Sequence, residues 1–314
     1  MVRSFLLWLS RQPKVFTFIR KNRVARRFAS RFVAGETVDT AVAAAVALHA
    51  RGITASVDIL GESVTEPAAA EAACAEYLAL LDRLAAAGVE VNASVKLTQM
   101  GLDIDPDLCE RNMRRILERA RSLGGFIRLD MESSAYTQAT LDFFERRLQP
   151  EFGPHVGVVI QSALRRSTGD VAHLVDLAAR VRLCKGAYLE PPEVAYPAKK
   201  DVDAHYVRLL QLLLEQGNYP GVATHDERII AGAEGFAGAH GIPPERFEFQ
   251  MLYGVRRDLQ VALRARGWRI RVYIPFGTQW YPYLMRRLAE RPANIAFILG
   301  SVLREGVSRK SIPS

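Results

Sequence analysis

The sequence has few cysteines, and neither its cysteines nor its histidines follow a metal-binding pattern. Cys74, Cys109 and Cys184 are an odd number and lie far apart, which argues against a disulfide framework and against a thiolate metal site. The six histidines show no metal-ligand spacing. We therefore expect no metal ion, and a reducing, cytoplasmic setting fits these cysteines best.

Long apolar runs and nucleotide-binding glycine motifs are also missing. No run of about twenty apolar residues could span a bilayer, so we expect a soluble chain. Neither Gly-x-Gly-x-x-Gly nor the phosphate-binding Gly-x-x-x-x-Gly-Lys follows an expected strand. No proline-rich or serine-rich linker divides the 314 residues, and this length suits one large barrel as well as two average domains.

Acidic residues are absent from the first 35 positions, which contain nine Lys or Arg. The rest of the chain has 33 basic against 34 acidic residues, so the net charge of +8 comes from the first 35 positions. Nucleic-acid binding is therefore not favoured, because the remaining chain offers no basic surface that would extend this charged segment. Apolar side chains between the cations indicate an interfacial amphipathic helix, and the apolar core is too short for a signal peptide. Residues 1–31 therefore predict peripheral contact with the inner face of a membrane. The alternative is a terminal helix that packs on the main body.

After Gly35, short apolar runs rich in β-branched residues alternate with longer amphipathic stretches. Helical patterns at 66–88 and 107–124 each end at a glycine that suits a helix C-cap. The expected strands are 52–60, 89–98, 125–132, 156–163, 180–188, 221–227, 247–254 and 269–277. Eight such units predict an α/β fold, a (β/α)8 TIM-type barrel over 36–300 with an N-terminal helical extension at 1–35 and a tail at 301–314. A doubly wound open sheet is the alternative.

Barrel enzymes carry out their chemistry at the carboxyl ends of the strands, so polar residues there are candidates. Arg182 lies within the fifth expected strand, and the strand ends hold Asp58, Lys96, Asp130, Gln161, Lys185, Tyr188, His225, Gln250 and Tyr273. This cationic and aromatic set suits an anionic ligand with an apolar body, and it suits a flavin, since fixed positive charge stabilises the reduced form. A structural interpretation stays open: Lys96 and Arg182 could face outward, and the tyrosines could be core rings.

Two adjacent arginines follow the eighth expected strand. In a helix, Arg286 and Arg287 would stand about 100° apart, so both could reach an anion over the helix end and bind it with two hydrogen bonds each. Glu290 lies three and four residues further on and could brace both arginines. The alternative is an ordinary solvated face with helical ion pairs, which would include Arg291.

Eight segments, in order, resemble the proline dehydrogenases, specifically the short, single-function bacterial form. They are "SVKLT", "RLDME", "VVIQSA", "VRLCKGAYLE", "VATHDE", "FEFQMLYG", "RVYIPFG" and "YLMRRLAERPAN", within about residues 35 to 300. The resemblance implies a distorted barrel that binds FAD and oxidises L-proline to (S)-1-pyrroline-5-carboxylate, the first step of proline catabolism to glutamate, with electrons passed to a membrane quinone. A separate pyrroline-5-carboxylate dehydrogenase would process the product, because no aldehyde dehydrogenase module is recognised in the sequence.

The resemblance also implies roles for individual residues. Arg286 and Arg287 would bind the proline carboxylate, aided by Lys96 and oriented by Glu290. Tyr188 and Tyr273 would form walls around the pyrrolidine ring. Asp130 would be a catalytic-site carboxylate, and Arg182 would lie near the flavin and stabilise its reduced form. The flavin-contacting positions would be Met131, Gln161, Arg182, Lys185, Gly186, Ala187, Tyr188, Thr224 and His225.

Two other classes of protein remain open at this stage. A Schiff-base aldolase on the same barrel could use Lys96 or Lys185 as its nucleophilic amine. A catalytically inactive barrel that only docks on membranes would keep the basic leader, but it would have no reason to keep the polar residues at the strand ends.

Overall fold

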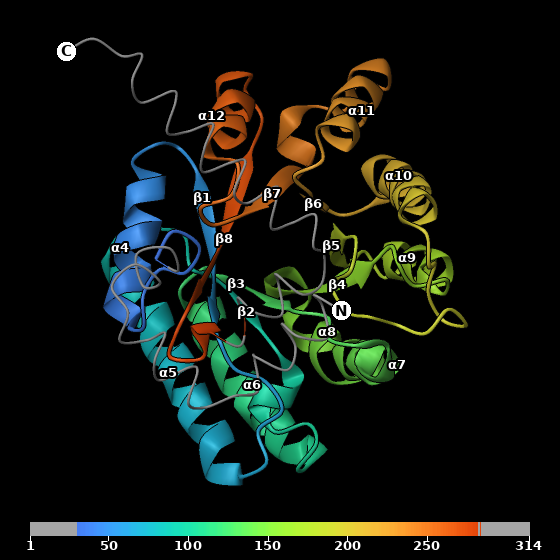
Figure 1. Ribbon diagram of the computed structural model, residues 1–314. Coiled ribbons are helices and arrows are strands. Elements are labelled where there is room, and N and C mark those ends of the chain that lie inside the picture. The colour runs from blue at the N-terminus through green and yellow to red at the C-terminus, as the bar shows by residue number, and fades with distance from the viewer. Residues whose placement is uncertain (1–29, 282, 284–314) are drawn as a thin grey trace, which may run out of the picture.

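Eight parallel strands close into a barrel in the order β1 to β8, with β8 paired to β1 (Figure 1). The structure, a computed structural model, describes residues 30–281 and 283. The strands are β1 (Thr54–Ile59), β2 (Asn92–Val95), β3 (Phe126–Leu129), β4 (Val156–Gln161), β5 (Arg180–Cys184), β6 (Gly221–Ala223), β7 (Glu248–Leu252) and β8 (Ile270–Phe276). The predicted barrel is confirmed, and the open-sheet alternative is wrong.

Each strand lies within its predicted range but is shorter than that range. The predicted boundaries are wrong because the backbone leaves the sheet soon after the last paired residue. Lys96, for example, precedes a 3-10 turn, η1 (Leu97–Met100), instead of extending β2. Lys96, Asp130, Lys185, Tyr188 and His225 consequently lie in the loops that follow their strands.

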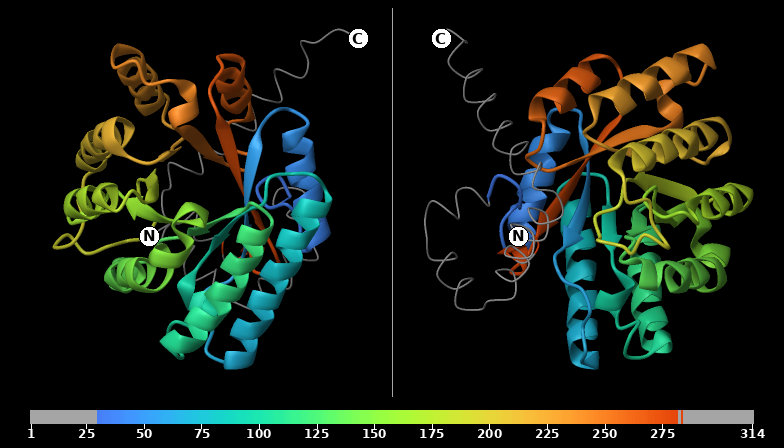
Figure 2. Two further views of the ribbon diagram at one scale, coloured as in Figure 1. Left: turned by 180° about the vertical axis from the view of Figure 1, so that it is seen from behind. Right: turned by 45° about the vertical axis from the view of Figure 1, so that its right-hand side comes forward.

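Helices form an outer ring around the strands (Figures 1 and 2). Their bounds are α4 (Val38–His49), α5 (Pro67–Ala86), α6 (Pro106–Ser122), α7 (Ser134–Phe143), α8 (Gln149–Phe152), α9 (Ser167–Asp176), α10 (Lys199–Gln216), α11 (Glu227–Ala239) and α12 (Arg257–Ala265). Helix α6 begins where Asp105 accepts hydrogen bonds from the amides of Asp107 and Leu108. Gly88 and Gly124 follow α5 and α6 with φ of 68° and 65°, as predicted for glycines at helix C-termini.

Helix α4, which precedes β1, packs against β1, β8 and α5 and covers the seam where the barrel closes. In the regular barrel pattern each helix follows its strand, so this place would belong to the helix after β8. Just after β8, Trp280 and Tyr281 pack at the mouth with Leu60 and Val255, which follow β1 and β7. Phe32 and Val33, near the end of the predicted extension, join the same cluster.

The apolar core lies mainly between the strands and the helices, whereas the inside of the barrel contains many polar groups. Buried polar residues on the strands include Ser56, Ser94, Arg128, Arg182, Glu248, Gln250 and Arg271. Barrel interiors are usually filled by branched apolar side chains, so this polar interior is a specific feature of the chain. Among the described helices, none is both long enough and apolar enough to cross a bilayer.

Candidate active site

Arg182 crosses the interior of the barrel from β5 and contacts four other strands or strand ends. Its Nη1 donates to Asp130 Oδ1 at 2.8 Å and to Ser94 Oγ at 3.1 Å. Its Nη2 lies 3.5 Å from Ser56 Oγ, and its Nε donates to Gln250 Oε1 at 2.5 Å. The outward-facing interpretation of Arg182 is therefore wrong. A guanidinium bound at each of its nitrogens is a fixed cation.

Asp130 joins Arg182 to Tyr273 at the mouth. The Tyr273 hydroxyl donates to Asp130 Oδ2 at 2.7 Å, while the other carboxylate oxygen accepts from Arg182. Burial, together with Asp130 and Asp58, raises the pKa of Tyr273 well above its usual value, so the hydroxyl stays protonated and remains the donor. The Arg182 guanidinium lies 5.3 Å from the centre of the Tyr273 ring, within cation–π range. The two carboxylate oxygens of Asp130 thus position the Tyr273 hydroxyl and the Arg182 guanidinium.

Lys96 is paired with a carboxylate that has no exposed surface. Its Nζ lies 3.0 Å from Oδ1 of Asp58, and the Lys96 side chain is only 14% exposed. Burial alone would lower the pKa of Lys96, but the nearby Asp58 and Asp130 outweigh burial and raise it above the ordinary lysine value. The ammonium of Lys96 is therefore charged at neutral pH.

Lys185 lies just beyond β5 between two carboxylates on the next helical segments. Its Nζ is 2.7 Å from Asp203 Oδ1 and 2.8 Å from Asp226 Oδ2. Burial would raise the pKa of each carboxyl, but the Lys185 ammonium and its neighbour Lys199 lower the pKa of both. The charge of Lys185 is thus balanced within the protein, and its side chain is fixed in place.

The remaining predicted cofactor residues lie along one side of the mouth. Gln161, at the end of β4, donates to the carbonyl oxygens of Met131 and Glu132 at 3.3 and 3.0 Å. His225 Nε2 accepts from the amide of Leu252 at 3.0 Å, so this nitrogen carries no proton. Gly186 and Ala187 follow β5, and Thr224 follows β6.

Tyr188 has a different setting from Tyr273. It lies in the loop after β5 with 37% of its surface exposed, so it is a rim residue. The structure thus joins Asp130, Arg182 and Tyr273 by hydrogen bonds at the mouth, with Lys96 held nearby by Asp58, and it places Tyr188 at the edge. The predicted substrate residues Arg286, Arg287 and Glu290 lie outside the described residues.

Sequence reasoning missed Glu132, which is buried immediately after Asp130 and Met131. Thr98 Oγ1 donates to Glu132 Oε1 at 2.6 Å, and Oε2 has no hydrogen-bond partner among the described residues. Burial raises the pKa of Glu132 to about 7, although the Thr98 hydrogen bond opposes this shift. Sequence reasoning also missed the hydroxyls of Ser56 and Ser94 as partners of Arg182.

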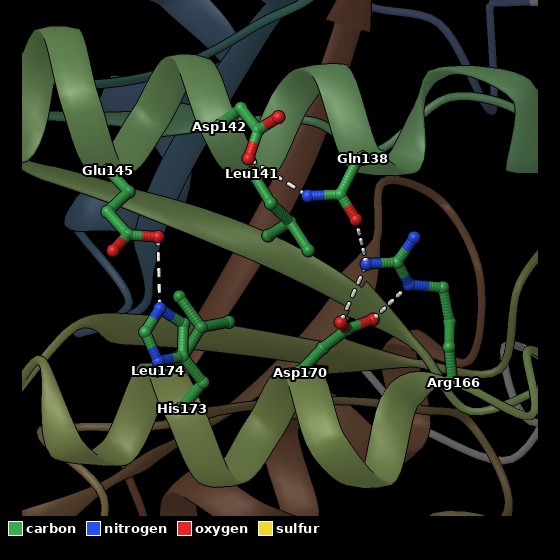
Figure 3. A pocket seen from close by; sticks show the side chains of 8 residues that line it. All are labelled: Gln138, Leu141, Asp142, Glu145, Arg166, Asp170, His173 and Leu174. Carbon is green, nitrogen blue, oxygen red and sulfur yellow. Dashed lines mark hydrogen bonds and ion pairs between the residues drawn. The ribbon is translucent and has the colours of Figure 1, made fainter.

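A separate hollow lies on the outer ring between α7 and α9 (Figure 3). Its polar side chains pair with one another: Arg166 with Asp170 and Gln138, and His173 with Glu145 at 2.9 Å. Within the part of the chain that the structure describes, no group of three or more His, Cys, Asp or Glu side chains could hold a metal ion.

Fold and site together define a (β/α)8-barrel enzyme with a charged and aromatic centre at the carboxyl ends of its strands. The family model described as proline dehydrogenase matches residues 41–299. The chain belongs to the proline dehydrogenase family, in its monofunctional form, which confirms the family predicted from the sequence.

Two proline dehydrogenases match over almost their whole lengths. Proline dehydrogenase of Deinococcus radiodurans is 46% identical over 306 residues, which cover 96% of this chain and 98% of the relative. Proline dehydrogenase 1 of Bacillus subtilis is 40% identical over 97% of this chain and 100% of its own. Proline utilization A of Bdellovibrio bacteriovorus, solved after inactivation by N-propargylglycine, superposes with a TM-score of 0.80 at 30% identity. This match covers 87% of the present chain but 33% of that longer protein.

Proposed function

We propose that this proline dehydrogenase uses FAD to oxidise L-proline to (S)-1-pyrroline-5-carboxylate and passes the electrons to a membrane quinone. In this oxidation the C5–H bond breaks with both electrons leaving as hydride, the nitrogen loses a proton, and a C5=N double bond forms. A separate pyrroline-5-carboxylate dehydrogenase would then consume the product. The observation that carries the proposal is Arg182, a cation fixed inside the barrel by acceptors from four other strands or their ends.

The residues at the mouth fit FAD by their chemistry. The donor set combines the Arg182 guanidinium and the Lys185 ammonium with the carboxamide of Gln161 and the hydroxyl of Thr224. When bound, FAD would supply the acceptor for the hydride. Arg182 would stabilise negative charge that develops on the cofactor, and Asp130 would keep this cation in place. The full holding set would be Met131, Gln161, Arg182, Lys185, Gly186, Ala187, Tyr188, Thr224 and His225.

The substrate would be oriented by charge at one end and by rings on its sides. Lys96 offers a charged ammonium for the proline carboxylate, and Tyr188 and Tyr273 would limit the movement of the ring. Arg286 and Arg287, oriented by Glu290, would complete the carboxylate site. Such orientation matters because transfer between two reactants requires them at near-contact distance.

The Schiff-base aldolase alternative is weaker. A nucleophilic lysine must be a neutral amine, which usually requires an apolar pocket or a second cation. Lys96 is paired with Asp58 and its pKa is raised, while Lys185 lies between Asp203 and Asp226. Lys96 thus stays a charged ammonium, and the Lys185 nitrogen is already bound by two carboxylates, so neither lysine is prepared to attack a carbonyl.

We expect the purified protein to be yellow and its flavin absorption to bleach under anaerobic L-proline. The cationic residues at the strand ends would favour the reduced cofactor, and the bound substrate would supply the electrons. A visible spectrum recorded before and after the addition of proline checks this. A colourless preparation that is folded and active would refute the flavin proposal.

We further propose that residues 1–31 bring the enzyme to the membrane that holds the quinone. Attraction of each cation to an anionic surface contributes about 1 kcal/mol at most, so binding should be reversible and sensitive to salt. Deleting residues 1–30 should weaken binding to anionic vesicles and leave proline oxidation with a soluble dye intact. Unchanged vesicle binding in a sedimentation assay would mean that this segment has no membrane role.

A further inference from the structure

We propose that Gln250 is a positioning residue that sets the orientation of the Arg182 guanidinium. This inference rests on the proposed role of Arg182 beside the cofactor and extends it to a residue on a different strand. Gln250 lies on β7 and is 5% exposed, and its Oε1 is the acceptor for Arg182 Nε at 2.5 Å.

The Nε contact constrains Arg182 in a way that its other contacts do not. Asp130, Ser94 and Ser56 bind the two terminal nitrogens, so a guanidinium held only by them could still pivot about that edge. The Nε–H bond lies in the guanidinium plane on a different edge, next to the side-chain stem. An acceptor at that position therefore fixes the plane of the cation as well as its place.

The amide of Gln250 can serve as this acceptor because Glu248 determines which way it faces. Gln250 Nε2 donates to Glu248 Oε1 at 2.6 Å. A reversed amide would put an N–H group against the Arg182 N–H and a carbonyl oxygen against the Glu248 carboxylate, so both contacts would be repulsive.

Glu248 is well suited to this task because it remains ionised. Arg271 Nε donates to Glu248 Oε1 at 2.6 Å, and the Tyr219 hydroxyl donates to Oε2 at 3.1 Å. Burial alone would raise the pKa of Glu248, but Arg271, Gln250 and Arg128 lower it to about 2. The carboxylate thus accepts hydrogen bonds throughout the neutral range, and it connects the lower barrel interior with Arg182.

Gly221 leaves the room that the Gln250 amide occupies. This residue lies on β6, next to β7, and a Cβ atom added to it would come within 2.5 Å of Gln250 Nε2 and 2.8 Å of Cδ. Since the clashing atoms are at the end of a flexible side chain, alanine at this position should displace the amide without breaking the sheet. Gly221→Ala therefore disturbs the orientation of Gln250 while every functional group stays present.

The test uses two variants that act on the same contact, Gln250→Met and Gly221→Ala, in the full-length protein loaded with FAD. Both should lower kcat for proline by about tenfold, because a hydrogen bond to a charged group is weakened or lost. KM should stay within about twofold, because neither change touches a residue proposed to bind the substrate. The flavin midpoint potential should become more negative, since Arg182 would stabilise the reduced cofactor less well.

Gly232→Ala is the matched control, because a Cβ atom on Gly232 in α11 meets nothing within 4 Å. It should keep the wild-type kcat and potential. If Gln250→Met and Gly221→Ala are folded, hold FAD and keep both values as well, the positioning role is wrong. A loss of activity that follows FAD content alone, with an unchanged potential in the bound fraction, also overturns it. If proline does not reduce the flavin of the wild-type protein, the proposed function itself is wrong.

Discussion

Replacing Arg182 by methionine should lower kcat for proline oxidation by about 100- to 1,000-fold, the usual effect of removing a preorganised group that stabilises developing charge. Arg182→Lys should recover only a small part of this loss. Lysine keeps the charge, but one ammonium cannot replace a planar fork that bonds to Asp130 and Ser94 from Nη1, to Ser56 from Nη2 and to Gln250 from Nε. Stopped-flow reduction of the bound flavin by proline measures the effect directly.

Stability must be followed in the same variants, because Arg182→Met leaves Asp130 without its cation. Removing one partner of a buried ion pair typically costs about 3 to 5 kcal/mol, so Tm should fall for the methionine variant and less for the lysine variant. Arg180→Met is the control, since Arg180 lies on the same strand two residues earlier and packs over the rings of Phe126 and Tyr219. It should lower stability and spare kcat. Normal flavin reduction in folded Arg182→Met would refute the assigned role.

Much of the barrel, and part of its centre, can be predicted from sequence patterns. The eight apolar segments and their helices indicate the fold, and polar residues at the strand ends indicate the site. A further signal lies inside the strands. Ser56 and Asp58 are two residues apart, as are Glu248 and Gln250, so each pair points to the same side of its strand. On strands covered by helices outside, polar residues of this spacing indicate a polar interior.

The partners of these residues could not be predicted in the same way. Arg182 contacts Asp130, Gln250 and Ser56, which lie 52, 68 and 126 positions away along the chain. Such contacts depend on the closure and the relative shift of the strands, and no local pattern encodes either. The pairing of Lys185 with Asp203 and Asp226 is similar, because two different helical segments must bring their carboxylates to one strand end.

The place of α4 has a consequence for the proposed substrate site. Because α4 covers the seam between β1 and β8, the outer position beside β8 is already filled by a segment from the start of the barrel. Trp280 and Tyr281, six and five positions before Arg286 in the sequence, pack at the mouth of the barrel. This supports the proposal that Arg286 and Arg287 bind the proline carboxylate, although both lie beyond the described residues.

If these arginines bind the carboxylate, Arg287→Lys should lower kcat/KM for proline by at least about tenfold. The change keeps the charge but replaces a planar two-point fork by a single ammonium, and each hydrogen bond to a charged group contributes roughly 1.5 to 3 kcal/mol. Arg286→Met should cost more, at least about 100-fold, because no charge remains to meet the carboxylate. Proline-dependent dye reduction, together with FAD content and Tm, separates lost binding from lost folding.

Arg291→Met is the matched control for the arginine pair. It removes a guanidinium from the same segment four residues after Arg287, and the proposal gives it no contact with the substrate. Its kcat/KM should therefore stay close to the wild-type value. The opposite pattern, a sensitive Arg291 beside tolerant Arg286 and Arg287, would mean that the arginine pair forms an ordinary charged surface. Lys96 would then be the one remaining cation proposed for the carboxylate. Lys96→Met should in that case abolish the reduction of the flavin by proline, because the ammonium that Asp58 holds beside the substrate would be gone.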